Sequence, residues 1–404
     1  MSDSTLTYDG EPLEKWLQDA HPSSSSMLAH RAAMRALPLW IATMTAAWTK
    51  TFKRSALPLL RLNLTVAAAR GRADDKILSA IQKTIIEIDL DRRARTAAGI
   101  FDSRDVLNDA DSAYDAVQAA FSSCEALIST KGSIAAEKAY DAVNSLLRAV
   151  EGYSVSDEHF SIFERSIWDS LQGDIEAAAS DEHITARPLC RLSNPLATSW
   201  EASIPILHGA PGGAFWIDWY QRALDGRPQN WPLLRDVALI DNALWQAGGD
   251  ELDREISRIA ERYRLLEEVY GLKAELAKVR AADAALAHRG HNHPPELISS
   301  DASELAGAVD ALSIKLDDAE QELERKQPSP SQLQSIGRAI KGLASAFLRY
   351  CGGFTHKTLQ ASADELGKSL GKWAGPAPGF YLASQSPKMI ELADALIRLA
   401  GKYR

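Results

Sequence analysis

The sequence predicts an all-α protein in which helical bundles are joined by a long antiparallel hairpin similar to a coiled coil. Three observations lead to this fold class. Apolar residues recur at heptad spacing over long stretches. Alanine-rich runs such as Ala116–Ala120 favour helix, whereas β-branched clusters bounded by turns are scarce. Of the 404 residues, 46% are apolar and 25% are charged, which is typical of a soluble chain with two or three domains.

Breaks in the helical pattern divide the chain into five expected segments. Prolines and glycines in Ile184–Gly213 indicate an irregular but ordered connector, and five of the ten tryptophans lie in Trp200–Trp245. The segments in order are a loose lead-in with a short helix (1–22), an alanine-rich helical bundle (23–183), the connector with a tryptophan-rich helical cassette (184–249), a long helical hairpin (250–326) and a C-terminal helical bundle (327–404).

Local signals place the helices of the N-terminal bundle. Ser23–Ser26 provides an N-cap for a helix that extends through Arg35. Pro38 and Pro58 each lie near the start of a further helix, where a missing N–H does little harm. The pair Asp74–Asp75 opens another helix.

A short internal echo follows in the same bundle. The pentapeptide Ala113–Val117 recurs 26 residues later as Ala139–Val143. The echo indicates either duplication of one helix or two helices that pack alike in a hairpin. Two copies are too few to predict a solenoid. A helix from about Asp157 to Ala179 closes this bundle.

The long hairpin is predicted from matched apolar stripes, each of which needs another helix to cover it. Because the connection is too short for another element, the two arms are expected to be antiparallel neighbours, the first about 55 Å long at roughly 1.5 Å per residue. The stripes are Leu252, Ile256, Ile259, Tyr263, Leu266 and Tyr270, then Leu265, Val269, Leu272, Leu276, Val279 and Leu286 in the first arm, and Leu305, Val309, Leu312, Leu316, Ala319 and Leu323 in the second.

The C-terminal bundle begins after Gln327–Pro330, which ends the hairpin. Ser331 and Gln334 form the pattern of a capping box at the start of the next amphipathic helix. Further along, Pro376–Ser386 is expected to be a loop and Met389–Tyr403 the last helix.

Composition and motifs argue against several functional classes. The net charge of −9 argues against nucleic acid as a partner. A cytoplasmic location is expected, because no secretory signal and no apolar stretch near 18 residues occurs. The distant cysteines Cys124, Cys190 and Cys351 indicate neither a disulfide framework nor a zinc site. No catalytic or nucleotide-binding signature supports an enzyme, and no cofactor is expected.

The stretch Arg31–Arg72 contains eight Lys or Arg and no acidic residue. Subtracting these eight charges from −9 leaves −17 on the remainder of the chain. Such a basic stretch either presents a surface to anionic lipid or an acidic partner, or pairs with the acidic remainder. The candidates for an anionic surface are Arg31, Arg35, Lys50, Lys53, Arg54 and Arg61.

The hairpin turn at 288–296 carries three histidines and a carboxylate, which are ligand types for zinc or nickel. Gly290, Asn292 and Pro294–Pro295 are, however, typical of a structural turn, so no metal is assigned. The third alternative is a tip that binds a partner, for which the candidates are His288, Arg289, His291, His293 and Glu296.

The tryptophan-rich cassette forms either an aromatic pocket for a ligand or peptide, or a packed core. The pocket candidates are Trp216, Asp218, Trp219, Tyr220 and Arg222.

Two motifs resemble those of a group of uncharacterised, mostly helical alphaproteobacterial proteins. They are WIDWYQRALDG at 216–226 and RGHNHPPE at 289–296. The resemblance covers about residues 28–300 and implies a common origin, but it brings no activity and no catalytic residue.

Together these features predict a non-enzymatic helical interaction or scaffold protein that binds a protein partner or itself. Two alternatives stay open at this point. One is an effector that binds an anionic membrane surface through the basic N-terminal helices. The other is a ligand sensor or enzyme with a pocket at the tryptophan-rich cassette.

Overall fold

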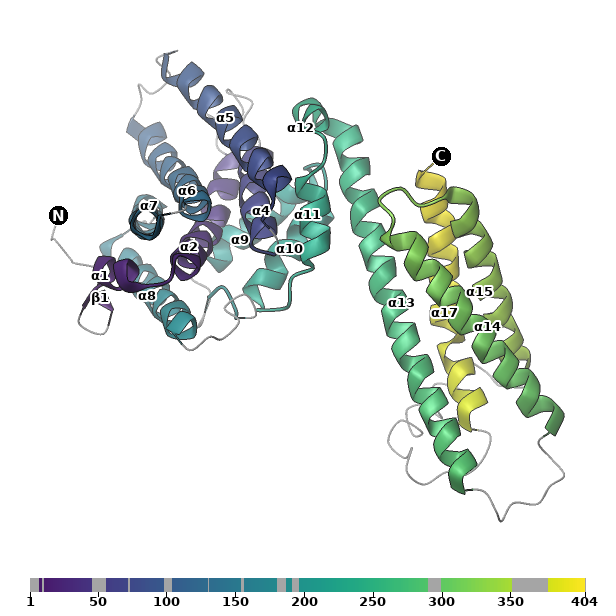
Figure 1. Cartoon of the computed structure of the whole chain (residues 1–404). Helices are drawn as coiled ribbons and strands as arrows, with labels where there is room; N and C mark the ends of the chain where they lie inside the picture. Colours follow the sequence, from purple (N-terminus) through teal and green to yellow (C-terminus); the bar gives the residue numbers. More distant parts are fainter. Residues whose placement is uncertain are drawn as a thin grey trace. The chain divides into compact units, whose positions relative to one another are not determined.

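The computed structural model describes residues 7–8, 11–45, 56–71, 73–97, 104–129, 131–153, 156–179, 187–190, 196–289, 299–350 and 377–403 (Figure 1). These ranges are almost wholly α-helical. The exceptions with regular structure are the antiparallel two-residue strands β1 (Thr7–Tyr8) and β2 (Glu11–Pro12) and a 3₁₀ turn, η1 (Thr43–Thr45). The predicted all-α fold is confirmed. The chain divides into two compact units, Met1–Ser257 and Arg258–Arg404.

Unit 1 is built around one buried helix, α2. Helices α4, α6, α7, α8 and α9 pack against it. The helices of unit 1 are α1 (Leu13–Asp19), α2 (Pro22–Ala42), α4 (Leu57–Gly71), α5 (Asp75–Ala97), α6 (Arg104–Ile128), α7 (Gly132–Tyr153), α8 (Asp157–Ala179), α9 (Ala197–His208), α10 (Gly213–Leu224), α11 (Trp231–Ala238), α12 (Asn242–Ala247) and the first residues of α13 (Gly249–Arg289). The expected bundle and the tryptophan-rich cassette therefore share one unit.

Helix α2 runs straight through Pro38, contrary to the prediction of a new helix there. A proline inside a helix has no N–H for the carbonyl four residues earlier, which here belongs to Met34. The hydroxyl of Tyr220 donates to that carbonyl oxygen at 3.1 Å. A side chain of the cassette thus supplies the hydrogen bond that the proline cannot. The N-cap is His21, not Ser23–Ser26, and its ring nitrogen accepts from the Ser23 N–H.

The repeated pentapeptide lies on α6 and α7, which pack against each other. Ala116 and Val117 of the first copy, and Ala142 and Val143 of the second, are buried. Equivalent residues thus face the core in both helices, as expected for two helices that pack alike in a hairpin. The predicted helix start at Asp74–Asp75 is confirmed by α5, because Asp74 Oδ1 accepts the Ile77 N–H at 3.1 Å.

Unit 2 contains the remainder of α13, α14 (Ser299–Glu324), α15 (Pro330–Tyr350) and α17 (Ala377–Lys402) (Figure 1). Ion pairs of Lys273 with Asp317 and of Arg280 with Asp310 set α13 and α14 antiparallel. The apolar stripes from Leu265 to Leu323 form one core with side chains of α15 and α17. Among the described side chains of the stripes from Leu265 onward, all but the exposed Tyr270 are thus covered within the same chain.

Two helix starts in unit 2 differ from the prediction. Helix α15 begins at Pro330, so Ser329 and not Ser331 precedes its first turn. Helix α17 begins at Ala377 and contains Pro387, so most of the expected loop is helical. Its close packing on α15 needs Gly337, where a Cβ atom would lie 2.8 Å from the Ala393 carbonyl oxygen.

Candidate functional site

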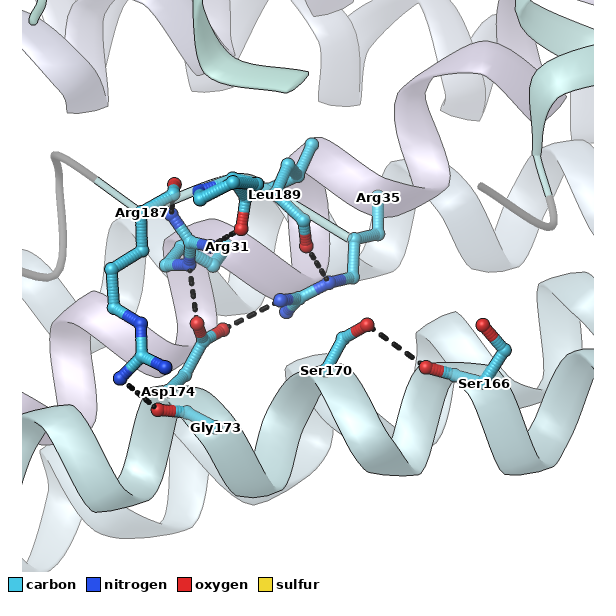
Figure 2. Close-up of polar contacts among 9 residues, drawn as sticks. Arg31, Arg35, Ser166, Ser170, Gly173, Asp174, Arg187 and Leu189 are labelled. Atoms are coloured by element: carbon cyan, nitrogen blue, oxygen red, sulfur yellow. Dashed lines mark hydrogen bonds and ion pairs between the residues drawn. The ribbon is translucent and has the colours of Figure 1, made fainter. Parts of the chain in front are cut away.

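Two arginines of α2 lie inside unit 1 and not on its surface. Arg31 and Arg35 are about one helical turn apart, so they share a face of α2, and both are buried. Figure 2 shows both guanidinium groups directed at Asp174 of α8. Arg31 Nε lies 2.9 Å from Asp174 Oδ1, and Arg35 Nη2 donates to Asp174 Oδ2 at 2.6 Å. One buried carboxylate therefore neutralises only part of the charge of two guanidinium groups.

The other donors of these arginines hold segment 187–190 against α2 (Figure 2). The hydrogen bonds are Arg31 Nη1 to Arg187 O (3.2 Å), Arg31 Nη2 to Pro188 O (2.6 Å) and Arg35 Nε to Leu189 O (2.8 Å). The Leu189 N–H in turn donates to Ala223 O of α10 at 2.9 Å. Gly226 permits this approach, because φ is +66° and a Cβ atom would lie 2.5 Å from Pro188 N.

A third guanidinium group, on Arg70 in the last turn of α4, pairs with no carboxylate of the described residues. Its Nε and Nη1 atoms are buried and form no hydrogen bond there. Burial, and then the charge of Arg31, lower the pKa of Arg70 from its ordinary value to about 10. Arg70 therefore stays charged at neutral pH without a counterion among the described residues.

The imidazole of His30 on α2 is also buried, and its Nδ1 atom has no hydrogen-bond partner among the described residues. Burial lowers the pKa of His30 from 6.5 to about 3, with further lowering from the charges of Arg70 and Arg31. The ring is neutral at pH 7. Its weak basicity follows first from burial and then from its place beside two cations.

His30, Arg31 and Arg70 line a cavity of about 40 Å³. A buried water needs roughly 10–15 Å³, so the cavity has room for a few waters or one small anion. Its polar lining is His30, Arg31, Arg70 and Gln229, and its apolar lining is Met27, Met34, Ala67, Leu189, Trp219, Ala223 and Trp231. Gln229 Oε1 is a further buried atom without a hydrogen-bond partner among the described residues.

The charge balance of this region points to an anion. Among the described residues here, three guanidinium groups, on Arg31, Arg35 and Arg70, accompany one buried carboxylate, that of Asp174. A buried charge without a partner is costly, and a guanidinium group is well suited to bind a carboxylate or phosphate. Cys190 adds no nucleophile, because burial raises the pKa of its thiol.

The predicted pocket residues of the cassette divide into two groups. Trp216, Trp219 and Tyr220 are buried, and Trp219 also lines the cavity. Asp218 and Arg222 form an ion pair of 2.8 Å on the outer side of α10. The cassette is therefore mostly packed core, and its polar members do not line the cavity.

The predicted basic surface is not formed by its described members. Arg31 and Arg35 are buried as above, and Arg61 is buried and contacts Glu87 and Asn242. These three side chains pair with the rest of the chain, which was the alternative to lipid binding. Lys50, Lys53 and Arg54 lie outside the described residues.

The side chains of the histidine-rich turn lie outside the described part of the chain. His291, His293 and Glu296 lie outside the described residues, and the side chains of His288 and Arg289 at the end of α13 do as well. Within the described part of the chain, no group of three or more His, Cys, Asp or Glu is arranged to hold a metal ion.

Sequence reasoning missed Asp174, His30, Arg70 and Gln229 as parts of one site. A local signal for burial exists, because Arg31 and Arg35 lie about one turn apart in a stretch, 27–42, that is otherwise apolar except for His30. No local signal identifies Asp174 as their partner, since it lies 139 residues after Arg35.

No family model, curated protein or solved structure matches the chain. None of the helices in the described ranges is long and apolar enough to cross a membrane. The arrangement of side chains in unit 1 is therefore the basis of the functional assignment.

Proposed function

We propose that the protein is a non-enzymatic binding protein whose unit 1 holds a small anion in the cavity lined by Arg70. The observation that carries this proposal is the Arg70 guanidinium, which is charged and lines the cavity without an acidic partner among the described residues. An anion held in this cavity beside Arg70 neutralises the charge of its guanidinium group.

A binding role fits this cavity better than a catalytic one. General acid–base chemistry at neutral pH needs a group whose pKa lies near 7. The pKa of His30 is about 3, and burial keeps the nearby Cys190 thiol protonated. Most of the remaining lining is apolar, which suits the retention of a ligand.

Calorimetric titration of the full chain with acetate, sulfate and phosphate tests this function. At least one of these anions is expected to bind with a stoichiometry of one. Replacing the cavity cation in Arg70→Met is expected to weaken that binding at least tenfold, because the charge-assisted hydrogen bonds are lost. The control Arg222→Met removes an outward-facing arginine of α10 and should leave the affinity unchanged. Equal binding by wild type and Arg70→Met contradicts the proposal.

A helical interaction or scaffold role of unit 2 is a second candidate. It is favoured by two large apolar side chains that are exposed on the hairpin, Tyr270 of α13 and Ile314 of α14. The other described stripe residues from Leu265 to Leu323 already pack in one core with α15 and α17, so self-association would use this outer surface. Light scattering after size-exclusion chromatography tests it: an oligomer that Tyr270→Ser with Ile314→Ser dissociates supports this role, and a monomer at all concentrations contradicts self-association.

A further inference from the structure

One outer face of the hairpin in unit 2 carries apolar residues between two levels of charged residues, and we call it the hairpin face. Its residues are Lys273, Ala277 and Arg280 of α13 and Asp310, Ile314 and Asp317 of α14, which in each helix follow the spacing of one side. An ion pair of 2.6 Å joins Lys273 to Asp317, and one of 2.5 Å joins Arg280 to Asp310. These pairs mark two levels of the antiparallel hairpin, and Ala277 and Ile314 lie at the level between them.

The apolar residues of the hairpin face are exposed to solvent. Ile314 is 57% exposed and Ala277 is also exposed, whereas Leu312 on the inner side of α14 is fully buried. Tyr270, which lies seven residues before Ala277 on the same side of α13, is 43% exposed. Exposed apolar side chains that gather on one face indicate an interaction surface. The described helices of unit 2 leave this face uncovered.

The charges of the hairpin face are separated by helix. Helix α13 contributes the cations Lys273 and Arg280, and helix α14 contributes the anions Asp310 and Asp317. The pairs within the hairpin leave these side chains between 32% and 70% exposed, so each charge can meet a second, opposite charge from outside. A matching partner therefore presents anions above α13 and cations above α14. A second copy of the hairpin carries both rows at the same spacing.

Two hairpins can face each other about a twofold axis in two ways. With the axis across the helices, α13 lies over α13 and α14 over α14, so cations face cations and anions face anions. With the axis parallel to the helices, α13 of each copy lies over α14 of the other at the same level. Opposite charges then face each other at both levels. Charge complementarity therefore selects the second arrangement.

Resting on the self-association proposed above for unit 2, we infer that the hairpin face binds a second copy of the chain about a twofold axis parallel to α13 and α14. Lys273 of each copy meets Asp317 of the other, and Arg280 of each copy meets Asp310 of the other. Between these two levels, Ile314 of each copy packs on the α13 helix of the other copy. The contact is the same for both copies, so it closes at two chains and forms no filament.

Charge reversal in the full-length chain tests this arrangement. The first variant reverses the cations (Lys273→Glu with Arg280→Glu), and the second variant reverses the anions (Asp310→Lys with Asp317→Lys). Light scattering over a concentration series is expected to show a dimer for wild type and a roughly tenfold or greater loss of affinity for each variant alone, because like charges then face each other. An equimolar mixture of the two variants is expected to regain the dimer, with one chain of each kind.

Control variants separate binding between copies from folding. Lys341→Glu with Lys388→Glu makes the same change of charge on α15 and α17, which do not belong to the hairpin face, and should leave the dimer intact. Ile314→Ser is expected to weaken the dimer, whereas Ile162→Ser, at a similarly exposed isoleucine of α8, should not. The reversed variants also lose exposed ion pairs within their own hairpin, which costs little stability. Misfolded chains would not regain a dimer when they are mixed.

The outcomes separate this inference from the proposed functions. A monomer at all concentrations contradicts both self-association and the role of the hairpin face. A dimer that charge reversal leaves unchanged, or that the mixture does not regain, overturns the twofold arrangement but leaves self-association in place. Anion binding by unit 1 is measured independently and is affected by neither result.

Discussion

Replacing Arg70 by methionine should make the unliganded protein more stable, although most substitutions of buried residues destabilise. The lowering of the Arg70 pKa from its ordinary value to about 10 corresponds to roughly 3 kcal/mol at about 1.4 kcal/mol per tenfold change. The position of Arg70 at the C-terminus of α4 offsets only about 0.3–1 kcal/mol of such a cost. Methionine keeps most of the aliphatic length without the charge, so we expect a gain of about 1–3 kcal/mol.

Urea unfolding followed by tryptophan fluorescence measures this change in unit 1, because nine of the ten tryptophans lie in Met1–Ser257. The matched control is Arg35→Met on α2. It leaves Leu189 O without its donor and Asp174 with one fewer cation, so a loss of about 3–5 kcal/mol is expected. If Arg70→Met destabilises as strongly as Arg35→Met, Arg70 is part of the framework and the argument for a ligand fails.

Three further perturbations have definite expected outcomes. The pKa of His30 is about 3 in the folded chain and 6.5 as the reference, so its contribution to the free energy of unfolding is lost as the pH falls from 6.5 towards 3. Between pH 7 and 5, urea unfolding should show that the wild type loses about 2 kcal/mol more stability than His30→Gln. Tyr220→Phe leaves the buried Met34 carbonyl without a donor, so the same assay should show a loss of about 1–3 kcal/mol, and an unchanged stability would refute the role given to that hydroxyl. Gly337→Ala should destabilise unit 2 by about 1–3 kcal/mol in hydrogen exchange, whereas Gly342→Ala, with open space around it on the same helix, should stabilise it by about 0.5–1 kcal/mol; similar effects at both glycines would contradict the close approach.

The helical periodicity was sufficient to predict the fold class and the core of unit 2. Apolar residues such as Leu265 and Leu312 belong to stripes that recur along one face of a helix, and the burial of these residues follows directly from that spacing. Helix boundaries at prolines were less predictable. Pro38 interrupts the local hydrogen-bond pattern, but the compensating hydroxyl comes from Tyr220, far away in the sequence. The helix propensity of the residues near a proline therefore cannot decide whether the helix continues through it.

The candidate site could be predicted only in fragments. Charge counting identified the basic stretch that contains Arg31 and Arg70, and aromatic content identified the cassette that contains Trp219. Whether an arginine faces solvent or a carboxylate depends on tertiary contacts, which a count of charges does not contain. Gln229 carried no sequence signal, because a single amide in a loop is ordinary.

The bonds between α2 and segment 187–190 also set an order for folding. They join residues 154 to 157 positions apart, so they give unit 1 contacts of very high sequence separation. During synthesis at roughly 5–20 residues per second, α2 emerges on the order of ten seconds or more before its partner segment. Over that interval its guanidinium groups remain hydrated and oppose premature burial of this helix. Complete docking of α2 is therefore expected to be a late event of chain synthesis.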